Sequence, residues 1–277
     1  MALNVATWQA EPGNSGSPFL FIHGITDRHE TWSEVAGGIR RGASAIAPDL
    51  RGHSRSGRTN GNYHFTDYPQ DLISLIESGA DLPVHIVGHS LGAIVAVQVA
   101  VQRPDLVNSL VLEDPPFYFQ QVVADNPKRA DNFRRNARLA GSGLTLEGIA
   151  AVIREFAPDL PEDSIQASAH ALFVTDAPVI KHALDLITDS SPEWINRVES
   201  VLTEIRCPTL LLQGSYELEE RRPLSVMRPQ DADQTVALIP DCKREFWSDW
   251  GHLLHNSDPQ RFIAQVTRFI DSLPSAS

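Results

Sequence analysis

The sequence predicts an α/β fold in which a mostly parallel central sheet is flanked by helices on both faces. Two observations support this prediction. Short apolar runs rich in β-branched residues alternate with helical patterns along most of the 277-residue chain, as in proteins with a parallel sheet. In addition, 42% of the residues are hydrophobic and no tract is compositionally biased, so the chain can bury a full core.

The expected strands are short apolar runs bounded by turn residues. They cover residues 19–22, 44–47, 83–87, 109–112, 209–212 and 235–239. The expected helices, of which the last has an amphipathic pattern, cover residues 32–40, 68–78, 91–100 and 259–273. The polar, glycine-containing segment 51–62 is predicted to be a loop.

The strand at residues 83–87 runs directly into the pentapeptide Gly-His-Ser-Leu-Gly at residues 88–92, and a helical segment follows. This G-x-S-x-G pattern between a strand and a helix is what a nucleophile elbow requires, because the serine must adopt a strained backbone conformation that lifts its hydroxyl above the sheet. Neighbouring chains then come so close that the positions two before and two after tolerate little beyond glycine. We therefore predict that Ser90 is a nucleophile; the alternative is that it only caps the helix. The elbow directs His89 away from the nucleophile, so His89 is expected to be structural.

A serine hydroxyl needs a neighbouring base to react at neutral pH, and the region after the last expected strand offers two histidines. His252 follows a glycine in a loop before the terminal helix, so we predict that His252 is the base. His255 lies one turn further on and is expected to be a surface or helix-capping residue.

The histidine in turn needs a carboxylate that fixes its tautomer, and two positions could supply it. Glu217 follows the strand at residues 209–212 at a suitable distance, and no aspartate lies beside it. Asp114, at the end of the strand at residues 109–112, is the alternative, although it could instead stabilise the loop before Pro115. The pattern favours Glu217 and leaves Asp114 open.

The oxyanion that forms during attack by a serine needs two preorganised backbone N–H donors. One is expected from Leu91, which directly follows the serine and opens a helix whose dipole favours negative charge. The other is expected from Ile25, because Gly24 lets the backbone of the loop after the first long strand approach closely. His23 and His53 are predicted to be structural residues of their loops.

A long stretch between two of the expected strands has no strand pattern. Residues 115–200 are charged, helical in pattern and interrupted by prolines, and they carry aromatic side chains in which a disordered linker would be poor. We predict a helical insertion that sits on the sheet, with a core domain formed by residues 1–114 and 201–277. The aromatic rings either form the insertion's own core or line an apolar pocket over Ser90. The candidates for the pocket are Phe117, Phe119 and Trp194.

Composition and charge argue against several other functions. The net charge of −12 argues against nucleic acid and membranes as partners. No signal peptide or membrane-spanning run is recognised, so the protein is expected in the cytoplasm, with Cys207 and Cys242 reduced. No residues have the spacing of a zinc site or of a nucleotide-binding loop, so neither a metal nor a cofactor is expected. The expected partner is a small-molecule ester, and the chain is expected to be a monomer or homodimer.

The order of these motifs resembles the α/β-hydrolase superfamily across nearly the whole chain. The resemblance rests on the elbow and on three further motifs, His-Gly at residues 23–24, DLRGHSRS at residues 49–56 and Gly-His at residues 251–252. The segments LEDPP at residues 112–116 and CPTLLL at residues 207–212 look like those of esterase-like members.

This resemblance implies an α/β-hydrolase fold in which the insertion is the helical cap. It also implies the same nucleophile, base and oxyanion-hole amides, which are Ser90, His252, Ile25 and Leu91. The sequence departs from the family at the acid, since the family usually has aspartate in the segment where Ser215 and Glu217 stand.

We therefore predict a serine hydrolase that cleaves a small or medium hydrophobic carboxylic ester through a Ser90 acyl-enzyme. Ser90 excludes the epoxide and haloalkane hydrolases of the superfamily, which use a carboxylate nucleophile. A lactonase, an amidase or carbamate hydrolase, a carbon–carbon bond hydrolase and a cofactor-free perhydrolase can share the same triad. A rival of another class is a non-catalytic ligand receptor that keeps the pocket.

Overall fold

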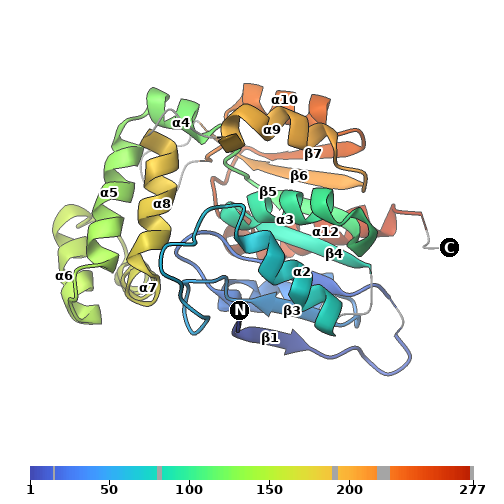
Figure 1. Ribbon diagram of the computed structural model, residues 1–277, viewed down its shortest axis with the longest axis horizontal. Coiled ribbons are helices and arrows are strands. Elements are labelled where there is room, and N and C mark those ends of the chain that lie inside the picture. Colours follow the sequence, from blue (N-terminus) through green and yellow to red (C-terminus); the bar gives the residue numbers. More distant parts are fainter. Residues whose placement is uncertain (15, 80–82, 189–192, 217–224, 275–277) are drawn as a thin grey trace.

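The centre of the computed structural model is a seven-stranded sheet (Figure 1). The structure describes residues 1–14, 16–79, 83–188, 193–216 and 225–274. The strand order is β1-β3-β2-β4-β5-β6-β7, in which β1 runs antiparallel to β3 and the other neighbours are parallel. The strands are β1 (Val5–Trp8), β2 (Phe19–Ile22), β3 (Ala45–Pro48), β4 (Val84–His89), β5 (Val107–Glu113), β6 (Thr209–Gly214) and β7 (Cys242–Trp247).

Helices cover both faces of this sheet, and each face has its own hydrophobic cluster. One cluster includes Leu72, Ile94 and Leu202 and joins the sheet to α2, α3, α9 and α10. The other includes Val35 and Phe262 and joins the opposite face to α1, α11 and α12. Because both faces are covered, every residue of β2, β4 and β6 is buried. The helices are α1 (Ser33–Ile39), α2 (Tyr68–Gly79), α3 (Leu91–Gln102), α9 (Glu193–Thr203), α10 (Pro229–Leu238), α11 (Leu254–Ser257) and α12 (Pro259–Asp271), with short 3₁₀ helices η1 (His29–Trp32) and η2 (Pro104–Leu106).

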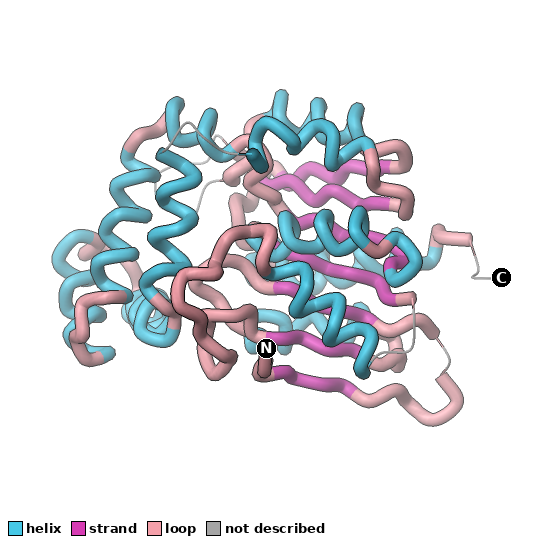
Figure 2. Tube along the Cα trace, in the orientation of Figure 1, coloured by secondary structure: helices cyan, strands magenta, loops and turns pink. Residues whose placement is uncertain are grey.

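The segment between β5 and β6 is helical, as the sequence predicts, and most of it stands apart from the sheet (Figure 1). Helices α4 (Phe119–Asp125), α5 (Lys128–Ala140), α6 (Leu146–Phe156), α7 (Glu162–Val174) and α8 (Ala177–Thr188) gather beyond the carboxyl ends of the parallel strands. Loops lie between this group and the sheet (Figure 2). The group has its own apolar cluster, which includes Ile153 and Leu172. In contrast, α9 packs against the sheet, so the boundary expected at residue 200 falls inside a helix of the core.

The helical group is joined to the core through the loop that follows β3. Ser54 donates its backbone N–H to Val174 O at 2.9 Å, and Asp176 donates to Gly52 O at 2.7 Å. The hydroxyl of Tyr63 also donates to the Asp176 carboxylate at 2.5 Å. These bonds hold the end of α7 and the start of α8 against the loop predicted at residues 51–62.

One predicted strand is wrong. The apolar run at residues 235–239 is the end of helix α10, and the strand that follows is β7. Helix α10 begins with Pro229 in its first turn, and the Asp231 carboxylate accepts a hydrogen bond from the backbone N–H of Arg228. Strand β7 lies at the sheet edge and carries three consecutive charged residues, so it lacks the apolar run by which the inner strands are recognised. The other five predicted strands are present, the one at residues 19–22 with the predicted bounds and the other four with slightly shifted bounds.

In the part of the chain that the structure describes, no helix has the length and apolar character needed to span a bilayer. Cys207 and Cys242 are half-buried free thiols, and burial raises the pKa of each to about 12. A thiol with such a pKa stays protonated at neutral pH and is a poor nucleophile.

A buried histidine at the amino-terminal end of β4 makes the stability of the fold depend on pH. His85 Nδ1 lies 2.8 Å from Ser109 Oγ on the neighbouring strand, and its ring packs against Phe19. Burial lowers the pKa of His85 to about 4. The unfolded chain binds a proton at this residue below pH 6.5, whereas the folded chain does so only near pH 4, so protonation favours unfolding in between.

We predict that His85→Asn reduces the loss of stability on acidification. Because the neutral ring is favoured in the fold, its contribution is present at pH 7 and is lost as the pH falls from about 6.5 toward 4. Urea unfolding at pH 7 and pH 5 measures this loss, which we expect to be smaller by about 2 kcal/mol in the variant. Equal losses in the two proteins would contradict the assignment.

Candidate active site

Ser90 occupies the sharp turn between β4 and α3, and its backbone has the strained conformation expected of an elbow. Its dihedral angles are φ 53° and ψ −116°, a conformation that costs a non-glycine residue about 1–3 kcal/mol. A Cβ on Gly88 would lie 2.6 Å from Gly92 O, and a Cβ on Gly92 would lie 2.1 Å from Ile22 O. The two glycines therefore let strand and helix approach closely enough to hold this turn. The turn is also tied to β5, since Ser90 donates its backbone N–H to Glu113 O at 2.9 Å.

His252 lies in the loop between β7 and α11, and its imidazole faces a buried carboxylate. Its Nδ1 is 2.6 Å from Asp114 Oδ2, and Asp114 is fully buried. The Asp114 carboxylate also accepts hydrogen bonds from Ser225 Oγ and from the backbone N–H of Val226, at 2.5 and 2.9 Å. A carboxylate held in this way accepts the Nδ1 proton of a neutral imidazole, so Nε2 is left as the basic nitrogen.

The structure thus brings His252 together with Asp114, the alternative acid of the sequence analysis. Glu217, which the sequence favoured, lies outside the described residues. The connection after β6, where the family resemblance places the acid, supports Asp114 instead through Ser225. Asp114 has φ 44°, an unusual conformation that turns the chain directly after β5. No sequence signal pointed to Ser225, because its role depends on contact with a residue more than a hundred positions away.

The two segments predicted to supply the oxyanion hole lie beside Ser90. A Cβ on Gly24 would lie 3.3 Å from Ser90 Cβ and 2.8 Å from His89 Nδ1, so the backbone that leads to Ile25 passes close to the elbow. Leu91 is the first residue of α3, and the first amides of a helix have no acceptor within it. The helix dipole also favours negative charge at this position.

Two buried histidines support the loops around the elbow. His23 Nδ1 donates to Gly24 O at 2.7 Å, and its Nε2 accepts from the backbone N–H of Leu50 at 2.9 Å. His53 Nδ1 donates to Arg51 O at 3.0 Å. Burial lowers the pKa of His23 to about 3 and that of His53 to about 4, so both rings are neutral at physiological pH. Both make the loop contacts expected of structural residues.

His89 contacts the loop that carries the candidate base. Its Nε2 donates to the backbone oxygen of His252 at 3.0 Å, and the two rings lie 4.6 Å apart. Burial lowers the pKa of His89 well below its usual value, which favours the neutral ring with a proton on Nε2. The residue before Ser90 therefore holds the backbone of the candidate base.

The prediction that His255 is a surface or helix-capping residue is wrong. His255 lies in α11 and is fully buried, with Nδ1 2.7 Å from Glu113 Oε2 and Nε2 2.7 Å from Thr31 Oγ1. Its ring stacks on Trp32 at 4.4 Å between centroids. No spacing along the chain pairs His255 with Glu113, because the strand and the helix that carry them are far apart in the sequence.

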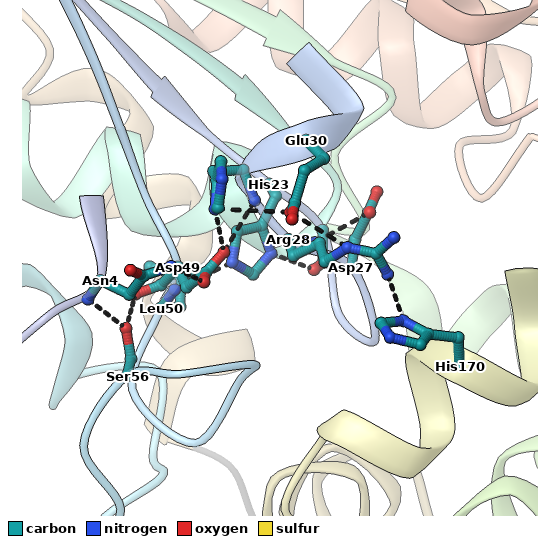
Figure 3. Close-up of polar contacts among 11 residues, drawn as sticks. Asn4, His23, Asp27, Arg28, Glu30, Asp49, Leu50, Ser56 and His170 are labelled. Atoms are coloured by element: carbon teal, nitrogen blue, oxygen red, sulfur yellow. Dashed lines mark hydrogen bonds and ion pairs between the residues drawn. The ribbon is translucent and has the colours of Figure 1, made fainter. Parts of the chain in front are cut away.

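A polar network lies next to the loop that carries Gly24 (Figure 3). The Asp49 carboxylate accepts from Asn4 Nδ2 at 2.7 Å and from the backbone N–H of His29 at 2.8 Å. Arg28 Nη1 donates to Nδ1 of His170, which belongs to α7 (Figure 3). This network connects the sheet, the loop and the helical group.

Within the same network, His29, Glu30 and Asp49 offer possible ligand atoms within 4.8 Å of one another. Each of them already has a partner in the chain. His29 Nδ1 lies 2.9 Å from Asp49 Oδ1, and Glu30 forms an ion pair with Arg28 at 3.0 Å. These contacts make the three residues part of the support of the loop.

The three aromatic residues predicted to line a pocket differ in their surroundings. Phe117 is fully buried in the cluster on the sheet. Phe119 begins α4 and makes an edge-to-face contact with Phe133 at 5.5 Å between centroids. Trp194 belongs to α9, and its side chain lies outside the described part of the structure.

Comparison with known proteins agrees with this architecture. A 2-(acetamidomethylene)succinate hydrolase from Mesorhizobium japonicum is 26% identical over 93% of this chain and 89% of its own length. An N-formylmaleamate deformylase from Pseudomonas putida is 24% identical over 94% of this chain and 90% of its own. A solved hydrolase from Pseudomonas aeruginosa has a TM-score of 0.73 at 19% identity and covers 98% of this chain and 94% of its own. Residues 19–265 match the alpha/beta hydrolase family, so the chain belongs to that family and is a hydrolase by relationship.

Proposed function

We propose that the protein is a serine hydrolase that cleaves a small or medium hydrophobic carboxylic ester through an acyl-enzyme on Ser90. The hydrogen bond between Asp114 and His252 is the observation that carries this proposal. It supplies an oriented base at the edge of the sheet where the strained Ser90 turn stands. A receptor that only binds a ligand has no need of such a base.

In the proposed reaction, His252 Nε2 removes the Ser90 proton as the hydroxyl oxygen attacks the ester carbonyl. The backbone amides of Ile25 and Leu91 stabilise the oxyanion of the tetrahedral intermediate. Collapse of the intermediate breaks the bond to the alcohol, which leaves with the proton held by His252. Water then attacks the acyl-enzyme by the same steps and releases the acid and the free Ser90. Asp114 holds the Nδ1 proton of His252 and stabilises the imidazolium that forms.

Helices α4–α8 would form the cap over this site, and apolar side chains such as Phe119 would then favour a hydrophobic acyl or alcohol group. Their position beyond the carboxyl ends of the strands supports this assignment, because ligands of open α/β sheets bind at that edge. The cap is proposed for residues 119–188, since α9 packs on the sheet.

An amide or similar carbon–nitrogen bond is the second candidate. It is favoured by two relatives that align over nine-tenths of this chain, whose names state an acetamido group and an N-formyl group. The same triad cleaves either bond, since only the leaving group differs. Lactones and carbon–carbon bonds are further candidate substrates for the same triad.

We predict that a fluorophosphonate probe labels Ser90 and inactivates the enzyme. Ser90→Ala should lose the labelling and lower kcat for the best substrate by several orders of magnitude. Turnover of p-nitrophenyl butyrate, of a matched anilide and of a lactone should be measured in parallel to separate the candidates. Full activity of Ser90→Ala would end the proposal, and release of a single equivalent of p-nitrophenol would favour a receptor.

We predict that Asp114→Asn lowers kcat by up to about 10⁴-fold, because the imidazole then adopts the wrong tautomer. Glu217→Gln is the matched control and should change kcat by no more than about threefold. Thermal unfolding of both variants checks that the fold is intact. A large loss confined to Glu217→Gln would assign the acid to the connection after β6.

We predict that Phe119→Ala changes the preference for acyl-chain length more than it changes stability. A lost apolar contact to the substrate is worth about 1–3 kcal/mol of discrimination. Phe117→Ala is the control for an effect on stability. Phe117 is fully buried, so its truncation should destabilise the fold by about 3–5 kcal/mol. The measurements are kcat/KM for p-nitrophenyl acetate through octanoate and the Tm. An unchanged chain-length ranking in Phe119→Ala would place its ring in the core of the helical group.

A further inference from the structure

A second histidine–carboxylate pair lies directly beside the pair formed by His252 and Asp114. Glu113, the last residue of β5, places Oε1 and Oε2 at 2.9 and 2.7 Å from His255 Nδ1. Glu113 Oε1 also accepts the backbone N–H of His255 at 3.0 Å. Both side chains are fully buried. Two consecutive residues at the end of β5, Glu113 and Asp114, therefore bind two histidines that are three positions apart.

The second pair continues into the segment proposed to hold the oxyanion amide. His255 Nε2 lies 2.7 Å from Thr31 Oγ1, and Asn256 Nδ2 donates to the same oxygen at 3.1 Å. Asp27 lies in the same segment, and burial raises the pKa of its carboxyl. Asp27 lies two residues beyond Ile25 in the chain. A continuous polar chain thus runs from the end of β5 to the segment after β2.

Three rings pack against the imidazole of His255. Trp32 stacks on it at 4.4 Å, and the rings of His89 and Phe262 meet it edge-on at 5.2 and 5.9 Å. Close packing of this kind transmits a small displacement rather than absorbing it. A shift of His255 would therefore move the backbone three residues earlier, where His252 stands.

We propose that Glu113 and His255 are positioning residues for hydrolysis. The hydrogen bonds between His255 and Glu113 fix the start of α11 and hence the backbone of the His252 loop, and Thr31 carries the same constraint to the segment that follows Ile25. The pair thereby sets the base and the oxyanion amide relative to each other. This inference rests on the proposed function. In this proposal the pair of Glu113 and His255 makes no contact with the substrate. Loss of the pair should therefore lower kcat and leave KM nearly unchanged.

The two nitrogens of His255 can be tested separately. His255→Asn keeps an amide near the position of Nδ1 and removes the link to Thr31, whereas His255→Gln reaches the position of Nε2 and removes the link to Glu113. Glu113→Gln removes the charge of the pair at nearly constant volume. Thr31→Val removes the hydroxyl, and Thr31→Ser retains it. His85→Asn is the matched control, because it replaces a buried, hydrogen-bonded histidine at the opposite end of β4.

The experiment measures the rate of Ser90 labelling by a fluorophosphonate, together with kcat and KM for p-nitrophenyl butyrate and the Tm. We expect Glu113→Gln and both His255 variants to lower the labelling rate and kcat by about 10–100-fold, with KM within about threefold. Thr31→Val should lower both rates. Thr31→Ser, which retains the hydroxyl, and His85→Asn should both keep them near the wild-type values. The effects of Glu113→Gln and His255→Gln should be less than additive when combined.

Labelling of folded Glu113→Gln or Thr31→Val at the wild-type rate would overturn the inference while the proposed function stands. The inference would also be overturned if His85→Asn and the other variants all lost activity in proportion to their loss of Tm. The pair would then act on stability alone. If the Glu113 and His255 variants do not fold, the comparison of Thr31→Val with Thr31→Ser decides. An unlabelled wild-type protein would instead refute the proposed function itself.

Discussion

The geometry of the site depends on the hydrogen bond between the Asp114 carboxylate and Nδ1 of His252. This bond joins the end of β5 to the loop after β7, across the intervening strand β6. A buried carboxylate is tolerated only when its oxygens are hydrogen-bonded, and Ser225 and Val226 from the connection after β6 complete its partners. Three neighbouring strand ends therefore have to be in register before the imidazole can be oriented.

Parallel strand order provides that register. Strands β4, β5, β6 and β7 are neighbours in sequence order, so their carboxyl ends bring the elbow, the acid, its support and the base to one edge. Ser90 adds a local constraint, because its strained backbone persists only while Gly88 and Gly92 let β4, α3 and β2 approach closely. The helical group is different. It has its own apolar cluster and meets the core through loop contacts and through Val179 of α8, so most of its side chains can vary without disturbing the edge of the sheet.

The sequence predicted the features that depend on residues close together in the chain and missed those that depend on contacts between distant residues. The inner strands were found because both faces are buried and their residues are continuously apolar. Strand β7 was missed because it is an edge strand with charged positions, and the run at residues 235–239 was misassigned because a short apolar run is compatible with helix or strand. His255 was misplaced for another reason. Its burial follows from contact with Glu113 and Thr31, to which no spacing in the chain points.

The sequence by itself determined the fold class, the nucleophile candidate and the base candidate. Each of these rests on neighbours along the chain: the alternation of strands and helices, the glycines on either side of Ser90, and the glycine before His252. Only the tertiary structure decided which carboxylate meets the histidine. Asp114 and His252 are 138 residues apart, and their contact exists because β5, β6 and β7 lie side by side with parallel ends. Spacing in the sequence measures distance along one strand or helix, whereas a hydrogen bond between side chains is set by how separate elements pack.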